Sequence, residues 1–222
     1  MTRAVLFDAI GTLIAIEPPA PHLQRSLARR LGCERALEEC AAAMRAEGAY
    51  YRAHGISGRD EESLAALRLG CAAVLARQLR LAHDPRAVVP CLLDALHFST
   101  YPDVASVLRE LSSLGYRLGV VSNMDCSLGA VLDGCGIGLH FEAIVDAATT
   151  GWAKPHPAPF ERALAALGCA PEAAVHVGDD PLTDIEGARV AGIRGVLLDR
   201  SGSTAGALGT LAELGTLLAV AA

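Results

Sequence analysis

The sequence is poor in aromatic and basic residues. It has four phenylalanines, four tyrosines and one tryptophan among 222 residues, and its formal net charge is −6. Non-specific nucleic-acid binding needs a basic surface, and single-strand binding adds aromatic side chains. We therefore expect no nucleic-acid partner. Charged residues make up only 20% of the chain and apolar residues 52%, so the chain can bury a large core and is not disordered.

Paired cysteines are also missing. The seven cysteines stand at positions 33, 40, 71, 91, 126, 135 and 169, so their number is odd and no two form a C-x-x-C motif. Disulfide frameworks, zinc sites and iron–sulfur sites are therefore poorly supported. Free thiols are typical of a reducing compartment, and this predicts a cytoplasmic protein.

A signal-peptide pattern is absent, because Asp8 interrupts the early apolar stretch. The segment 204–222 is long enough to cross a membrane and carries one charged residue, Glu213. Its glycines at 206, 209 and 215 favour a terminal strand and helix instead. We therefore expect no membrane partner.

The apolar run that precedes Asp8 predicts a buried strand at residues 4–7. Residues 20–95 are rich in good helix formers and show no clear strand. From Tyr101 onwards, short apolar runs alternate with amphipathic segments. Examples are a helix whose apolar face includes Val104, Val107, Leu108, Leu111 and Leu114, then the strand "RLGVVSN", and later the strands "AAVHVGD" and "GVLLD". This alternation predicts an α/β fold with a parallel sheet (residues 1–15 and 97–222) and a helical insertion (residues 16–96).

Chemically active residues follow the predicted strands. Asp8, Ser122-Asn123 and Asp179 each end a strand, and Lys154, the single lysine of the chain, lies in a loop between a strand and a helix. The carboxyl ends of parallel strands share one edge of the sheet, where ligands bind. Crowded carboxylates resist ionisation unless a cation such as Mg²⁺ holds them. A metal with a lysine and hydroxyl or amide donors suits a phosphoryl group, which a carboxylate can attack.

Four motifs in this order resemble the haloacid dehalogenase superfamily of hydrolases. They are "FDAIGTL", "VVSN", "GWAKPHP" with Lys154, and "VGDDPLTD", and together they extend over nearly the whole chain. The resemblance implies a Rossmann-like core and makes the insertion an α-helical cap domain. It also implies an enzyme whose substrate is a small molecule, with Mg²⁺ as the cofactor.

The resemblance assigns a role to each matching residue. Asp8 would be the nucleophile that accepts the phosphoryl group, and Lys154 would neutralise both. Ser122 and Asn123 would hold the transferring group. The metal ligands would be Asp8, Asp179 and the backbone carbonyl of Ile10, and Asp184 would support the metal directly or through water.

Other polar residues have simpler interpretations. Asp180 precedes a helix, where an acid is expected to cap the helix rather than to take part in chemistry. The seven histidines show no metal-like spacing and are expected to be structural or exposed. His156, which follows the lysine loop, is the one that we single out.

Ile10 departs from the pattern of the superfamily's phosphatases, which usually have a second aspartate at this position to protonate the leaving group. A phosphatase could borrow an acid from the insertion, where Glu17, His22 and His54 are candidates. A 2-haloacid dehalogenase needs no proton donor, but it also needs neither metal nor the acids of "GDDPLTD". A non-catalytic binding relative is the third alternative. Because Asp179 and Asp184 are present, we favour a Mg²⁺-dependent phosphatase that acts on a phosphate ester or acyl phosphate.

Overall fold

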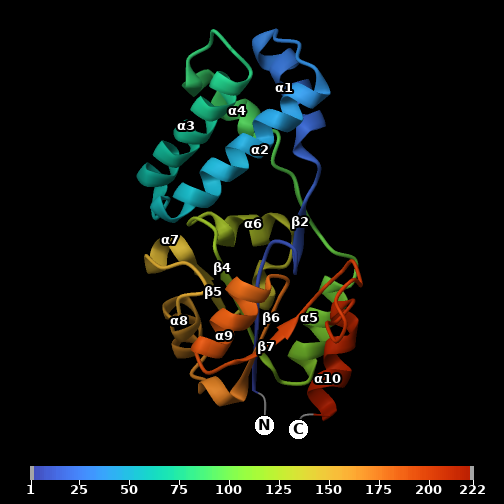
Figure 1. Cartoon of the computed structure of the whole chain (residues 1–222). Helices are drawn as coiled ribbons and strands as arrows, with labels where there is room; N and C mark the ends of the chain where they lie inside the picture. Colours follow the sequence, from blue (N-terminus) through green and yellow to red (C-terminus); the bar gives the residue numbers. More distant parts are fainter. Residues whose placement is uncertain (1–2, 221–222) are drawn as a thin grey trace. The chain divides into compact units, whose positions relative to one another are not determined.

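The core of the protein is a five-stranded parallel β-sheet, seen in a computed structural model that describes residues 3–220 (Figure 1). The strands lie in the order β5-β4-β1-β6-β7. Their bounds are β1 Ala4–Phe7, β4 Arg117–Ser122, β5 Ala143–Asp146, β6 Ala174–Gly178 and β7 Arg194–Leu197. Every pairing between neighbours is parallel, so the predicted α/β class is confirmed.

Strand β1 lies at the centre of this sheet. All of its residues, from Ala4 to Phe7, are fully buried, as expected for an apolar strand covered on both faces. Phe7 pairs with Val120 of β4 on one side and with Val177 of β6 on the other. This register aligns the carboxyl ends of the three strands, so the residues that follow them meet at one edge.

Helices cover both faces of the sheet, as in a Rossmann-like fold (Figure 1). Helices α8 and α9 lie on one face, and α5 and α10 lie on the other. The bounds of the helices of this unit are α5 Val104–Ser113, α6 Leu128–Gly134, α7 Ala147–Thr150, α8 Ala158–Ala166, α9 Gly187–Val190 and α10 Leu214–Val220. Helix α8 buries Phe160, Ala163 and Leu164 in a cluster with Leu6 and Val121 of the sheet. The apolar face of α8 therefore fixes the helix against the strands that carry the candidate site.

The apolar face predicted for α5 is wrong at one residue, Leu114. Val104, Val107, Leu108 and Leu111 are buried, but Leu114 is 63% exposed. The helix ends at Ser113, and Leu114 lies in the turn that follows it, where the helical period no longer applies.

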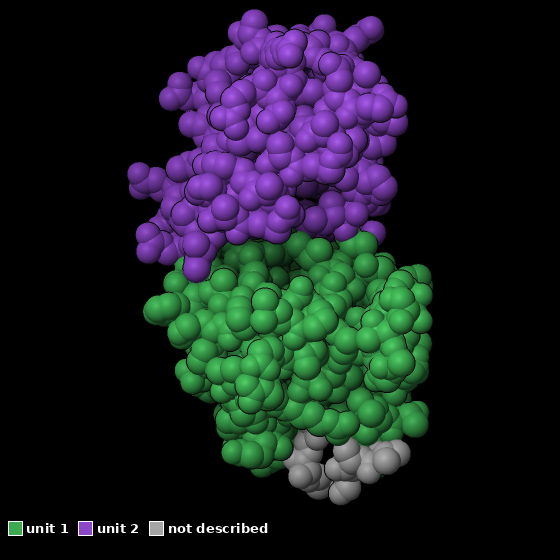
Figure 2. Space-filling view, in the orientation of Figure 1, with its two compact units in different colours: residues 1–15, 100–222 green, residues 16–99 purple. Residues whose placement is uncertain are grey.

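The chain divides into two compact units, a core unit of residues 1–15 and 100–222 and a helical unit of residues 16–99 (Figure 2). The helical unit consists of α1 Pro19–Leu31, α2 Leu37–His54, α3 Glu61–Gln78 and α4 Pro85–Leu93. Two short strands, β2 Ile14–Ile16 and β3 Phe98–Thr100, pair where the chain passes between the units. At three residues each, these strands are too short for a recognisable period in the sequence.

The C-terminal segment contains a helix, as predicted, but not the predicted strand. Helix α10 is present, whereas the strand is reduced to one bridge between Leu198 and Leu208. Among residues 3–220, no helix is both long and apolar enough to cross a membrane, and no disulfide forms.

Candidate active site

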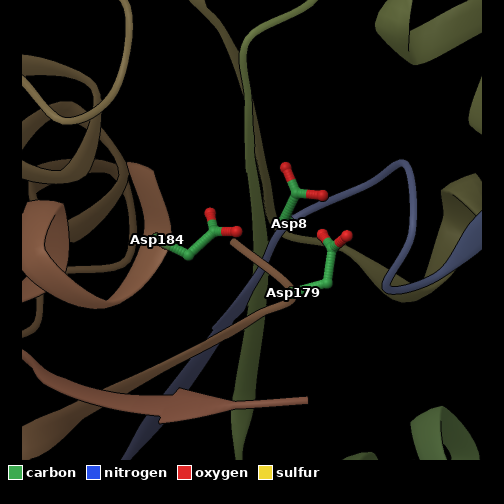
Figure 3. Close-up of side chains that lie close together, drawn as sticks. All are labelled: Asp8, Asp179 and Asp184. Atoms are coloured by element: carbon green, nitrogen blue, oxygen red, sulfur yellow. The ribbon is translucent and has the colours of Figure 1, made fainter. Parts of the chain in front are cut away.

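Three aspartates meet at the carboxyl edge of the sheet (Figure 3). Asp8 follows β1, Asp179 follows β6, and Asp184 belongs to a π-helical segment, Pro181–Glu186. One carboxylate oxygen from each lies within 4.8 Å of the other two. Asp8 and Asp184 are 8% and 1% exposed. The sheet therefore brings together the three side chains predicted to lie near a metal.

Lys154 lies between two of these carboxylates. Its Nζ atom is 2.7 Å from Asp8 Oδ1 and 2.5 Å from Asp184 Oδ1, and only 4% of the residue is exposed. Burial lowers the pKa of Lys154, but the attraction of the two carboxylates outweighs burial and holds this pKa above its ordinary value. The single lysine of the chain is therefore a charged group of the site and not a surface residue.

The two buried carboxyl groups have opposite pKa shifts. Burial raises the pKa of Asp8 to about 6, although the attraction of Lys154 acts against it. For Asp184, burial also raises the pKa, but hydrogen bonds from His176 and Lys154 outweigh burial and hold it below its usual range. Burial also raises the pKa of Asp179. The site therefore sets three carboxyl groups against one ammonium group.

Two glycines make room for these carboxylates. A Cβ atom on Gly11, whose φ is +92°, would lie 2.3 Å from Asp179 Oδ2. A Cβ atom on Gly178 would lie 2.2 Å from Asp184 Cγ. The loop after Asp8 therefore approaches Asp179 closely. The backbone of Gly11, the neighbour of Ile10, thus lies beside the acidic cluster. The Ile10 side chain is apolar and partly exposed, so it supplies no proton donor.

Asn123 is joined to the lysine loop by two hydrogen bonds. Its Nδ2 atom donates to the Lys154 carbonyl at 3.0 Å, and the Lys154 backbone N–H donates to Asn123 Oδ1 at 2.7 Å. The neighbouring Ser122 ends β4 and is 3% exposed. Asn123 thus fixes the loop that carries Lys154, a contact that could not be predicted from residues 31 positions apart.

The polar residues given simpler interpretations behave as follows. Asp180 caps the π-helical segment, since its Oδ1 accepts hydrogen bonds from the backbone of Leu182 and Thr183. His156 accepts a bond from the Ala158 backbone and stacks on Trp152, with ring centroids 4.1 Å apart. His156 therefore contacts the lysine loop and the first residue of α8.

His176 is a site residue that sequence reasoning missed. It lies in β6, is fully buried, and places Nε2 3.1 Å from Asp184 Oδ1. Burial lowers its pKa to about 4, although the hydrogen bond to Asp184 acts in the opposite direction. A histidine three residues before Asp179 was the available signal, but it also fits an ordinary buried residue of a strand.

Two of the three candidate proton donors of the helical unit contact each other. His22 Nε2 lies 3.4 Å from Glu17 Oε2, and His22 also stacks on His97. His54 has a separate environment, in which it stacks on Tyr50 and its Nδ1 lies 2.8 Å from the Tyr50 carbonyl.

Comparison with known proteins identifies relatives of the whole fold. A model of the haloacid dehalogenase-like hydrolases matches residues 2–192. Haloacid dehalogenase-like hydrolase domain-containing protein 3 of Homo sapiens is 30% identical over 208 residues, which cover 88% of this chain and 81% of that protein. Its counterpart in Danio rerio is 39% identical, but the match covers only 50% of this chain and 51% of that protein, about half of its length. Phosphoglycolate phosphatase of Rhodospirillum rubrum is 32% identical over 208 residues, or 89% of this chain and 80% of that protein.

Solved structures of two activities share this fold. A haloacid dehalogenase superfamily phosphatase from Thermococcus onnurineus has a TM-score of 0.65 at 25% identity and covers 98% of both chains. A 2-haloacid dehalogenase from Pseudomonas syringae pv. Tomato has a TM-score of 0.68 at 25% identity and covers 100% of both chains. Since phosphatases and dehalogenases share the architecture, the chemistry has to be argued from the site.

Proposed function

The chain belongs to the haloacid dehalogenase-like hydrolases, and we propose that it is a Mg²⁺-dependent phosphatase that forms an aspartyl-phosphate on Asp8. The observation that carries this proposal is the cluster of three carboxylates around one buried lysine. Three carboxyl groups around one ammonium group favour a cation, and hard oxygen ligands suit Mg²⁺. The phosphatase among the relatives named above supports the same reaction class.

The donor set fits a magnesium ion. Asp8, Asp179 and the backbone carbonyl of Ile10 would hold it, and Asp184 would support it directly or through water. The close approach of Gly11 to Asp179 is consistent with a carbonyl ligand from this loop. When bound, the ion would polarise the phosphoryl oxygens and lower the repulsion between the substrate and the acids.

Asp8 is the proposed nucleophile. Its carboxylate forms a bond to phosphorus while the bond from phosphorus to the leaving-group oxygen breaks. Lys154 keeps Asp8 ionised and offsets the negative charge of the phosphoryl group. The Ser122 hydroxyl and the amide hydrogen that Asn123 does not donate to Lys154 bind the transferring group. Water then cleaves the acyl phosphate, which releases phosphate and restores Asp8.

Ile10 shapes the choice of substrate. Because this position supplies no proton, the leaving group has to depart as a stable anion or be protonated from elsewhere. Acyl and aryl phosphates meet the first condition, whereas alkyl phosphates release a strongly basic alkoxide. We propose a small phosphorylated metabolite as the substrate and assign the choice among metabolites to the helical unit, as its cap.

The same isoleucine supports a second candidate, a 2-haloacid dehalogenase. In that reaction the Asp8 carboxylate displaces halide from carbon, and the halide needs no proton. Asp179 and Asp184 argue against this candidate, because a metal-free displacement has no need of a second and a third carboxylate beside the nucleophile.

A substrate panel separates these candidates. The purified protein and Asp8→Asn are assayed on acetyl phosphate, p-nitrophenyl phosphate, an alkyl phosphate and 2-chloropropionate, each with Mg²⁺ and with EDTA. We expect phosphate release that requires both Mg²⁺ and Asp8. Chloride release that EDTA does not affect would establish the dehalogenase instead. Folded, Mg²⁺-saturated protein without any turnover would favour a non-catalytic relative.

A further inference from the structure

His176 is an anomaly in its strand. The sequence of β6 is "AVHVG", and every residue of it is buried. The side chain of His176 has no exposed surface, and its ring meets Phe160 edge-on, with centroids 4.9 Å apart. Burying a polar ring among apolar residues is unfavourable unless hydrogen bonds compensate, so a histidine here needs a specific partner.

That partner is Asp184. His176 Nε2 lies 3.1 Å from Asp184 Oδ1, the same oxygen that accepts from Lys154 Nζ at 2.5 Å. The other oxygen, Oδ2, accepts from the Asp180 backbone N–H at 3.0 Å. Three donors thus fix the plane and the position of a single buried carboxylate.

The hydrogen-bond pattern assigns the tautomer of the ring. Within residues 3–220, Nδ1 of His176 has no hydrogen-bond partner, whereas Nε2 faces an ionised carboxylate. A carboxylate only accepts, so the ring hydrogen belongs on Nε2. In this tautomer a neutral ring donates to Asp184 without adding a second positive charge beside Lys154.

We propose that His176 is a positioning residue for the phosphoryl-transfer site, acting as a neutral Nε2–H donor that holds Asp184 so that Lys154 stays on Asp8. The inference rests on the proposed function for its kinetic consequence, but not for its structural one. Without the donor, Asp184 can rotate and Lys154 loses its second fixed acceptor. Small displacements of catalytic groups lower rates by about 10²-fold.

Two substitutions separate hydrogen bonding from packing. His176→Gln keeps an N–H donor at a reach close to that of Nε2, and His176→Leu keeps the volume and loses the donor. His140→Gln serves as a control for the loss of an imidazole. His140 lies in the 3-10 helix Gly138–His140 before β5, at the amino edge of the sheet, whereas the acidic cluster lies at the carboxyl edge. Thermal unfolding shows first whether each variant is folded.

The kinetic readout is the split between kcat and KM on p-nitrophenyl phosphate. We expect His176→Leu to lower kcat about 10²-fold with KM changed less than threefold. We expect His176→Gln to recover kcat to within about tenfold of the natural protein. Equal kcat values for folded His176→Leu and the natural protein would overturn the proposal, as would equal losses in the Leu and Gln variants.

A readout independent of activity keeps the proposal testable should the phosphatase assignment fail or His176→Leu not fold. Long-range ¹H–¹⁵N spectra of the natural protein at pH 7 should show His176 as the neutral Nε2–H tautomer. A crystal structure of His176→Gln should retain the Lys154–Asp8 contact. An Nδ1–H tautomer or an imidazolium ring in the natural protein would contradict the inference. A displaced Lys154 in His176→Gln would contradict it as well.

Discussion

Two ion pairs in this molecule have the same length and different surroundings. Lys154 Nζ lies 2.7 Å from Asp8 Oδ1 in the core unit, and Arg30 Nε lies 2.7 Å from Asp94 Oδ2 in the helical unit. The side chains of the first pair are 2% and 11% exposed, those of the second 42% and 27%. Water screens the second pair, whereas the first interacts in a medium that strengthens attraction and makes an unpaired charge unfavourable.

The same contrast extends to the two units as a whole. Among the described residues, the only buried polar or charged side chains of the helical unit are Ser26 and Glu47. The others are all in the core unit: Asp8, Thr12, Ser122, Asp125, Asp146, Lys154, His176 and Asp184. Reactive groups that need a low dielectric are therefore concentrated in the core unit, whose sheet edge can hold them in place.

Removing the cation of each pair gives the largest expected difference. Lys154→Met leaves two buried carboxylates without their shared ammonium, and we expect kcat to fall by roughly 10²–10³-fold. Lys154→Arg should not restore activity, because a wide guanidinium cannot replace a compact ammonium in a packed site. Arg30→Met removes an exposed charge, and kcat should stay within about threefold.

Steady-state kinetics on acetyl phosphate measure these effects, with circular dichroism to verify folding. Full activity of Lys154→Arg would show that any cation near the site suffices. A similar loss in Lys154→Met and Arg30→Met would mean that burial does not distinguish the two pairs.

Gly178 and Gly129 offer a matched pair of glycine-to-alanine substitutions. A Cβ atom on Gly178 would overlap Asp184, which three hydrogen bonds hold in place, so Gly178→Ala should lower kcat by about 10²-fold. A Cβ atom on Gly129 would meet nothing within 4 Å. Because Gly129 lies in the first turn of α6, Gly129→Ala should change the free energy of unfolding by less than about 0.5 kcal/mol and leave kcat unchanged.

Urea denaturation and kinetics on the two variants test this prediction together. If Gly178→Ala is fully active, Asp184 can move without loss, and its exact position is not required.

The site residues that sequence analysis found have something in common. Asp8, Ser122 and Asp179 could be predicted because each ends a strand or directly follows one, and parallel strands share an edge. Lys154 stood out as the single lysine of the chain. Their exact roles in catalysis stay predictions, as does the cap role of the helical unit.

The contacts that were missed depend on tertiary structure. His176 occupies an inward position of a buried strand, where its type alone does not distinguish packing from hydrogen bonding. Its partner lies eight residues further on, in a π-helical segment that the sequence indicated only as a helix. Helical segments of the other unit could be predicted from composition, but no residue pattern there indicates what the unit recognises.

The pH dependence of stability tests the buried histidine. The pKa of His176 is about 4 in the folded protein and 6.5 when exposed, so the unfolded chain binds the extra proton first as the pH falls. The stabilisation is therefore complete above pH 6.5 and is lost as the pH falls to about 4, a loss of roughly 3 kcal/mol. The raised pKa of Asp8 has the opposite effect on stability below pH 6, because the folded protein binds that proton first. This effect is expected both in the natural protein and in the variants.

Comparing the natural protein with His176→Gln isolates the contribution of the histidine. Urea denaturation at pH 7 and at pH 4.5 should show a larger loss of stability on acidification for the natural protein. Parallel losses in the two proteins would indicate that His176 titrates near its ordinary pKa and is not protected by burial.

The smallest expected effect concerns Ile10, where restoring an acid tests whether the core unit lacks only a proton donor. Ile10→Asp should raise turnover of alkyl phosphates by about tenfold and that of acetyl phosphate much less, because only the alkoxide needs a proton to leave. This increase in turnover should be smaller than that from a well-placed acid. Asp8 is two residues from position 10 and Asp179 lies against Gly11, and both disfavour another ionised carboxylate. Ile10→Asn, with the same shape and no transferable proton, is the control. If the natural protein already turns over alkyl and aryl phosphates equally, another residue donates the proton, and the contacting pair Glu17 and His22 of the helical unit becomes the next to substitute.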